Sequence, residues 1–129
     1  KMKILGIGVD VIQNKRIRNL IKNKTFINRT FGKKEIKISK KITNKTNYFA
    51  KRFASKEAFV KSLGTGFRDN LNFKDIEVLN DKLGKPYLSK SKKINYLMYK
   101  RFGIKKYNLF LSISDETDYS IAFIILQTK

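Results

Sequence analysis

Residues 49–66, FAKRFASKEAFVKSLGTG, constrain the fold of this chain more than any other stretch. At about 100° per residue the large apolar side chains fall on one stripe, which predicts a long amphipathic helix with one buried face. We expect Asn44 or Thr46 to cap this helix and Leu63 to end it. The stripe consists of Phe49, Phe53, Val60 and Leu63.

Charged side chains interrupt this apolar surface, and two interpretations of them stay open. In the first, Lys56 packs its stem and extends its ammonium to water, while Glu57 pairs with Lys61 for roughly 0.2–0.5 kcal/mol. Gly64 is then an ordinary helix C-cap. In the second, these charges serve a ligand, because the turn Gly64–Gly66 exposes backbone N–H groups that can cradle a phosphate.

The opening stretch ILGIGVDVI predicts a strand that is apolar on both faces and therefore central in a sheet. By period-two alternation, Asp10 shares its face with Gly6 and Gly8. A carboxylate there costs several kcal/mol unless it is paired or binds a metal, and the glycines leave room for a close neighbour. Alternatively, Asp10 caps the next helix or pairs with Arg16.

The remaining pattern predicts an α+β fold, a mostly antiparallel sheet packed against the long central helix, in one domain over residues 1–129. Short helices are expected after a cap at Asn14 and over Gly32–Lys41, where Ile36 faces inward. The other expected elements are a strand near Ile76–Leu79 with a hairpin to a second strand, a helix near Ser91–Phe102, and two terminal strands joined by Asp115–Asp118.

The composition limits the catalytic groups and metal ligands that the chain can use. The chain has no cysteine and no histidine, which excludes a thiol nucleophile and a histidine base, and leaves oxygen ligands for any metal. The net charge of +20 predicts a polyanionic or acidic partner. No apolar run approaches the roughly 20 residues that span a bilayer, so we expect a cytoplasmic protein that binds no membrane.

Two carboxylates and a lysine-flanked glycine turn favour one chemistry. Asp10 and Glu57 could hold a hard divalent cation together with waters and substrate phosphates. Lysines would neutralise the remaining phosphate charge. Such a set of residues is typical of phosphoryl-type transfer, where the metal and the cations stabilise developing charge.

Four motifs make the chain resemble the holo-[acyl-carrier-protein] synthases, the short 4′-phosphopantetheinyl transferases. They are GIGVDV, RFASKEAFVKSLGTG, GKPYL and LSISDETDYSIAFII, and together they span essentially the whole chain. The resemblance implies transfer of the 4′-phosphopantetheine arm of coenzyme A to a serine of apo acyl carrier protein, in support of fatty acid biosynthesis. Adenosine 3′,5′-bisphosphate would be the by-product.

The resemblance also implies roles for individual residues. Asp10 and Glu57 would bind Mg²⁺, and either Glu57 or a carboxylate-bound water would take the serine proton. Lys61 would act in catalysis by stabilising the leaving group. The residues expected to contact the cofactor are Lys56, Lys61, Gly64, Thr65, Gly66 and Ser114.

Partners and assembly follow from the same resemblance. The family docks the acidic carrier protein on its first helix, where Arg16 and Leu20 are the expected contacts. Members of this length resemble trimers whose active sites lie between subunits. One departure is Asp115, which stands where the family usually has histidine; we interpret it as a turn residue that caps the final hairpin.

Two alternative functions remain open at this point. A family member impaired by Asp115 could bind coenzyme A or carrier protein without turnover. A basic nucleic-acid-binding module is the other, but the lysines are spread evenly and the aromatic residues follow a core periodicity. We therefore expect no specific nucleic-acid partner.

Overall fold

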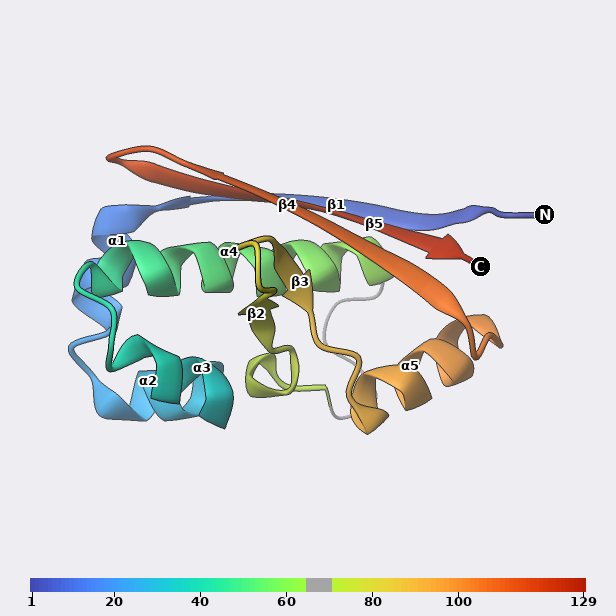
Figure 1. Ribbon diagram of the computed structural model, residues 1–129, viewed down its shortest axis with the longest axis horizontal. Coiled ribbons are helices and arrows are strands. Elements are labelled where there is room, and N and C mark those ends of the chain that lie inside the picture. The colour runs from blue at the N-terminus through green and yellow to red at the C-terminus, as the bar shows by residue number, and fades with distance from the viewer. Residues whose placement is uncertain (65–70) are drawn as a thin grey trace.

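The computed structural model describes residues 1–64 and 71–129, which form a three-stranded antiparallel sheet lying along one long helix (Figure 1). The sheet has the strand order β1-β5-β4, and helix α4 packs against its inner face. These elements confirm the predicted α+β fold with its antiparallel sheet and central helix. Their bounds are β1 (Ile4–Gln13), α4 (Lys45–Leu63), β4 (Tyr107–Asp115) and β5 (Tyr119–Thr128).

Smaller elements complete the fold, and most lie on the side of α4 away from the sheet (Figure 1). The hairpin predicted to begin near Ile76–Leu79 and the helix predicted near Ser91–Phe102 are confirmed, but helix α2 was not predicted. The elements are α1 (Asn14–Leu20), α2 (Lys24–Thr30), α3 (Lys33–Ser39), the 3-10 turn η1 (Phe73–Asp75), β2 (Val78–Asn80), β3 (Pro86–Leu88) and α5 (Lys92–Phe102).

Helix α4 begins and ends where its sequence predicts. The side chain of Asn44 accepts a hydrogen bond from the backbone N–H of Asn47 at 3.0 Å, which caps the first turn. At the other end Gly64 has φ 78°, a left-handed conformation that glycine adopts without strain. The four residues of the predicted apolar stripe are all buried.

Strand β1 crosses α4 at very short range, and two glycines make this possible. A Cβ atom on Gly8 would lie 1.9 Å from the carbonyl oxygen of Ala58, and one on Gly6 would lie 2.0 Å from that of Ser62. A side chain at either position would clash with the helix backbone. The glycine face of β1 therefore packs on α4, and Asp10, two residues further on, points to the same side.

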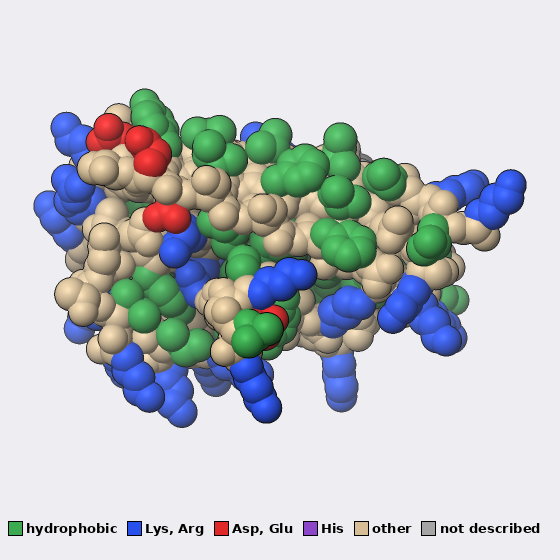
Figure 2. Space-filling model, turned by 45° about the horizontal axis from the view of Figure 1, so that its top comes forward, with side chains coloured by type: hydrophobic (Ala, Val, Ile, Leu, Met, Phe, Trp, Pro, Cys, Tyr) green, Lys and Arg blue, Asp and Glu red, His purple; other side chains and the backbone are tan. Residues whose placement is uncertain are grey.

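The prediction of a central β1 is wrong, because β1 is an edge strand and β5 is central. The outward side chains of Ile7, Val9 and Val11 are between 50% and 60% exposed. They are apolar although no element within residues 1–64 and 71–129 covers them. Figure 2 shows such apolar side chains gathered over the outer face of the sheet.

Two residues near the N-terminal helices differ from expectation. Asn14 does not cap α1; it is buried, and its Nδ2 donates to the carbonyl oxygens of Glu116 and Thr117, each at 3.0 Å. It thus ties the start of α1 to the β4–β5 turn. In α3 the inward residue is Glu35, which is fully buried, whereas Ile36 is only half-buried.

No helix in residues 1–64 or 71–129 has the length and apolar character needed to cross a lipid bilayer.

Candidate active site

Asp10 and Glu57 come together where β1 crosses α4. The side chain of Asp10 is 14% exposed and Glu57 is half-buried. Burial raises the pKa of Glu57, and the negative charge of Asp10 raises it further, while Lys61 and Arg16 oppose the rise. The two carboxylates are thus near enough to repel one another, as two ligands of one cation must be.

Lys61 completes this group from the next turn of α4. Its Nζ donates to Asp10 Oδ1 at 3.1 Å and to the carbonyl oxygen of Val9 at 3.0 Å. In the described residues its ion pair is therefore with the strand, and not along the helix with Glu57 as the spacing suggested. The side chain is 55% exposed, so it can exchange Asp10 for another anion.

Glu57 also lines an open cavity of about 600 Å³ between α1, α2 and the segment around η1. Phe53 and Phe73 form apolar walls with ring centroids 5.4 Å apart. Arg16 stands at the edge, with its guanidinium carbon 5.9 Å from the Phe53 ring centroid. The cavity therefore has aromatic walls, one carboxylate, and a basic rim of Arg16, Arg29 and Lys74.

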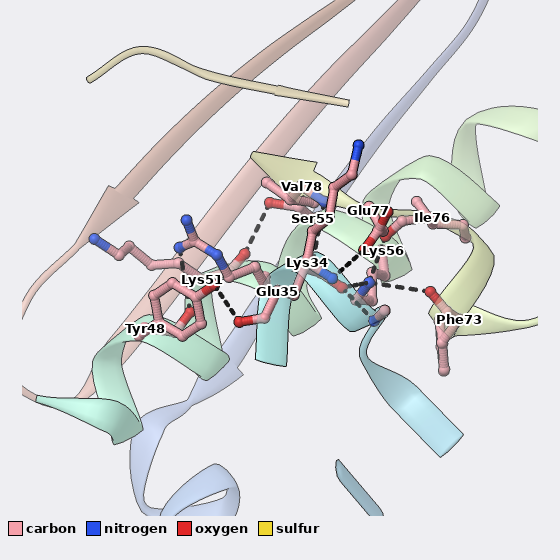
Figure 3. Close-up of polar contacts among 12 residues, drawn as sticks. Lys34, Glu35, Tyr48, Lys51, Ser55, Lys56, Phe73, Ile76, Glu77 and Val78 are labelled. Atoms are coloured by element: carbon pink, nitrogen blue, oxygen red, sulfur yellow. Dashed lines mark hydrogen bonds and ion pairs between the residues drawn. The ribbon is translucent and has the colours of Figure 1, made fainter. Parts of the chain in front are cut away.

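Lys56 lies on the buried face of α4, away from solvent. Its ammonium is fully buried and donates to Glu35 Oε1 at 2.6 Å, to the carbonyl oxygen of Phe73 at 3.0 Å, and to that of Ile76 (Figure 3). The snorkelling interpretation is wrong. The expected cofactor contact is not seen either, because no part of the ammonium is exposed to meet a ligand.

Glu35, which the sequence did not suggest as important, holds this network together. Its Oε1 also accepts the N–H of Gly32 at 2.9 Å, and its Oε2 accepts the N–H of Val78 at 3.0 Å. Burial raises the pKa of Glu35, and the charge of Lys56 opposes that rise. A Glu in the first turn of α3 was a usable signal, but Gly32 at the cap has no side chain to complete the motif.

Ser114 lies on the other side of the sheet from Asp10. It pairs in register with Ile121, which in turn pairs with Val11, and these apolar partners are exposed on the outer face. One chain therefore does not bring Ser114 to the two carboxylates.

Asp115 ends β4 and does not cap the turn that follows it. Its carboxylate accepts a hydrogen bond from Nδ2 of Asn47 in α4. The turn is capped by Glu116, whose Oε1 accepts the N–H groups of Asp118 and Tyr119 at 3.1 and 3.0 Å. The interpretation of Asp115 as the capping residue was wrong by one position.

The remaining expected site residues are placed only in part. Arg16 is exposed on α1, and Leu20 is half-buried with its side chain packed against the core. Gly64 follows the last turn of α4. Thr65 and Gly66 lie outside the described residues.

The Asp10–Glu57 pair suits a hard cation. Carboxylate oxygens are the ligands that Mg²⁺ prefers, and it commonly takes one or two from the protein and the rest from water and phosphate. Among the described residues there is no group of three or more Asp, Glu, His or Cys side chains that could hold a metal. Asp10 and Glu57, the second of which lines an accessible cavity, suit this more open arrangement.

The fold and this pair of carboxylates define a class of transferase. The family model of the 4′-phosphopantetheinyl transferase superfamily matches residues 6–124, and the chain belongs to this superfamily. The relatives carry one name. A holo-[acyl-carrier-protein] synthase from Pelagibacter ubique is 59% identical over 128 residues, covering 99% of this chain and 100% of the relative.

Solved structures agree with this assignment. The holo-[acyl-carrier-protein] synthase of Neisseria meningitidis has a TM-score of 0.87 and 36% identity, covering 96% of this chain and 98% of that one. The synthase of Bacillus anthracis, determined in complex with CoA (3′,5′-ADP), has a TM-score of 0.81 and 33% identity, with both chains covered in full at 100%.

Proposed function

We propose that this chain transfers the 4′-phosphopantetheine group of coenzyme A to a serine of apo acyl carrier protein and releases adenosine 3′,5′-bisphosphate. The observation that carries the proposal is the meeting of Asp10, Glu57 and Lys61 at the β1–α4 crossing. The family supports it, because the named relatives are synthases of holo acyl carrier protein across their full length.

The reaction exchanges a phosphoanhydride bond for a phosphoester bond. The serine oxygen forms a bond to the phosphorus that carries the pantetheine arm, and the bond from that phosphorus to the bridging oxygen of the pyrophosphate breaks, so that this oxygen leaves with adenosine 3′,5′-bisphosphate. Negative charge develops on the departing bisphosphate. Mg²⁺ held by Asp10 and Glu57 would supply charge neutralisation at the phosphates.

Glu57 and Lys61 act at opposite ends of this exchange. Glu57 lines the cavity with a half-buried carboxylate, which can take the serine proton, directly or through a water. Lys61 has an exposed ammonium beside the same carboxylates. It can turn from Asp10 toward phosphate oxygens and stabilise the charge of the leaving group.

The acidic carrier protein would approach over α1. Arg16 stands at the mouth of the cavity that Glu57 lines, so a partner held by Arg16 has its serine within reach of that carboxylate. Leu20 on the same helix adds an apolar contact. The net charge of +20 favours rapid encounter with an acidic partner.

A homotrimer would complete the site. The outer face of the sheet exposes apolar side chains on all three strands (Figure 2), and such a surface is typical of an interface. Ser114 lies on that face, so a neighbouring copy could present it to the cofactor bound at Asp10 and Glu57. The exposed apolar residues are Ile4, Ile7, Val9, Val11, Phe110, Tyr119, Ile121 and Phe123.

A transfer assay tests the proposal. The protein is incubated with coenzyme A, Mg²⁺ and apo acyl carrier protein, and the carrier protein is weighed by mass spectrometry with and without a chelator. We expect the mass of the carrier protein to rise by that of phosphopantetheine only when no chelator is present. Coenzyme A binding without transfer over hours would contradict the proposal and favour an impaired family member.

Glu57→Gln is the matched control for this assay. It keeps the size of the side chain and removes the charge, so we expect transfer to fall about 10²–10⁴-fold, the range of a general base. Transfer by this variant at the parent rate would show that the site has been assigned to the wrong carboxylate.

A further inference from the structure

The proposed mechanism gives no task to Lys56, although it precedes Glu57 in the same helix. Lys56 and Glu35 form an ion pair with both side chains 0% exposed. Such pairs lose so much hydration energy that apolar replacements are often as stable or more so. Stability alone therefore does not explain why a lysine stands among the phenylalanines and alanines of α4.

The contacts of Lys56 indicate what it does. Besides Glu35, its ammonium holds two backbone carbonyls, those of Phe73, the first residue of the turn η1, and of Ile76, which follows the turn (Figure 3). The turn has hydrogen bonds of its own, from the Asp75 N–H to the Asn72 carbonyl and from the Asn72 N–H to the Asp75 carboxylate, but these lie within the segment. The contacts of Lys56 tie the segment to α4.

This segment is one wall of the cavity that Glu57 lines. Leu71, Asn72, Phe73 and Lys74 all contribute to that wall, and the Phe73 ring packs on Phe53 of α4. Lys56 hydrogen-bonds to this wall without lining the cavity itself, whereas Glu57, the next residue, lines the cavity. A single turn of helix therefore sets both the carboxylate and the wall opposite it.

We propose that Lys56, held by Glu35, is a positioning residue. Lys56 fixes the Phe73 wall of the cavity relative to Glu57 and so shapes the surface that binds the serine-bearing segment of the carrier protein. The aromatic walls and the basic rim of the cavity match an acidic segment with an apolar side. The inference rests on the proposed function for its substrate. Its geometry rests on the three hydrogen bonds of Lys56.

The test must separate positioning from mere stability. Lys56→Met alone leaves Glu35 charged and unpaired in the core, and this variant can fail to fold. The double variant Lys56→Met with Glu35→Leu removes both charges and restores an apolar core, but it lacks the clamp on the two carbonyls. Met98→Ala is the control, because Met98 is fully buried in α5 and does not line the cavity.

Steady-state kinetics with apo acyl carrier protein and coenzyme A give the first measurement. We expect the double variant to fold but to melt below the parent, because the N–H groups of Gly32 and Val78 lose the acceptor that Glu35 gives them. We expect its KM for the carrier protein to rise about tenfold, because misplaced binding groups weaken alignment, and its KM for coenzyme A to stay unchanged. Met98→Ala should lower the melting temperature and leave both KM values as in the parent. A folded double variant with the parent KM would overturn the inference, and so would an equal rise in Met98→Ala.

Fluorescence gives a second measurement that needs no turnover. The chain contains no tryptophan, so Phe73→Trp creates a single reporter on the wall. Adding Lys56→Met and Glu35→Leu to this reporter should shift its emission to longer wavelength as the wall loosens. If the parent chain performs no transfer, the proposed function fails, and unchanged emission in the triple variant would separately overturn the role of Lys56.

Discussion

Among the lysines of helix α4, Lys56 and Lys61 stand five residues apart, and each makes an ion pair in very different surroundings. Lys56 meets Glu35 at 2.6 Å with both side chains 0% exposed. Lys61 meets Asp10 at 3.1 Å with the two side chains 55% and 14% exposed. A lysine–carboxylate pair thus supports the fold on one side of the helix and belongs to the candidate active site on the other.

Solvent makes this difference. A buried pair with further hydrogen bonds is rigid, and removing one partner leaves a charge that nothing neutralises. An exposed pair is weak because water screens it, so either partner can leave for a stronger ligand. Lys61 can therefore respond to a phosphate, whereas Lys56 can only hold what surrounds it.

The largest effect that the comparison predicts is on stability at the buried pair. Lys56→Met should lower the free energy of unfolding by about 3–5 kcal/mol, the cost of leaving a buried partner charge uncompensated. Urea unfolding followed by circular dichroism measures this loss. A loss below about 1 kcal/mol, the range of exposed ion pairs, would show that the two ion pairs do not differ in their contribution to stability.

The contact that brings Asp10 to Lys61 can be disturbed without touching the buried pair. Gly8→Ala places a methyl group 1.9 Å from the carbonyl oxygen of Ala58, so strand and helix must separate. We expect a loss of about 1–3 kcal/mol, typical of overpacking, together with slower transfer. Met98→Ala, on the core side of α5, is the control, and an equal loss of transfer there would argue against a site between β1 and α4.

The exposed pair should contribute little to stability and more to binding. Lys61→Met should change the free energy of unfolding by about 0–1 kcal/mol, yet raise KM for coenzyme A, since the phosphates lose a cation. The difference from the parent should shrink as salt is added, because salt screens exposed charges. An unfolding loss as large as that of Lys56→Met would show that Lys61 is structural too.

The smallest effect concerns Glu57, which follows Lys56 in sequence but belongs with Lys61 in space. Its pKa is raised by burial first and by Asp10 second, so the folded state holds this proton more tightly than the unfolded chain. Stability from this group is present at low pH and is lost as the pH rises through the raised pKa. Thermal unfolding of Glu57→Gln should therefore match the parent at low pH and exceed it slightly at neutral pH; the opposite order would contradict the assigned shift.

Local sequence signals predicted much of this structure. The cap at Asn44, the end of α4 at Leu63 and the face of Asp10 all depend on residues within a few positions of each other. The meeting of Asp10 with Glu57 required more, because it spans two elements. Two glycines that allow the backbones to touch were the physical signal for it.

The failures involve partners that are distant in sequence, or a surface that the described residues leave uncovered. Glu35 is 21 residues from Lys56, and a lysine beside an apolar stripe does not reveal which carboxylate will meet it. The apolar outer face of β1 predicted a central strand, because alternation shows that a side chain avoids water and not what covers it. Asp115 was confused with Glu116 because either acidic side chain could cap the same turn.

The pairing of β1 with β5 has a consequence for the order of folding. Asp10 faces Ala122 in the register of these strands, and β1 has no other neighbour in the sheet. Asp10 is therefore held in place by a strand that comes far later in the sequence. Long-range pairing of this kind is slow compared with helix formation, so α4 can fold early, while the carboxylate that faces it waits for β5 to pair with β1.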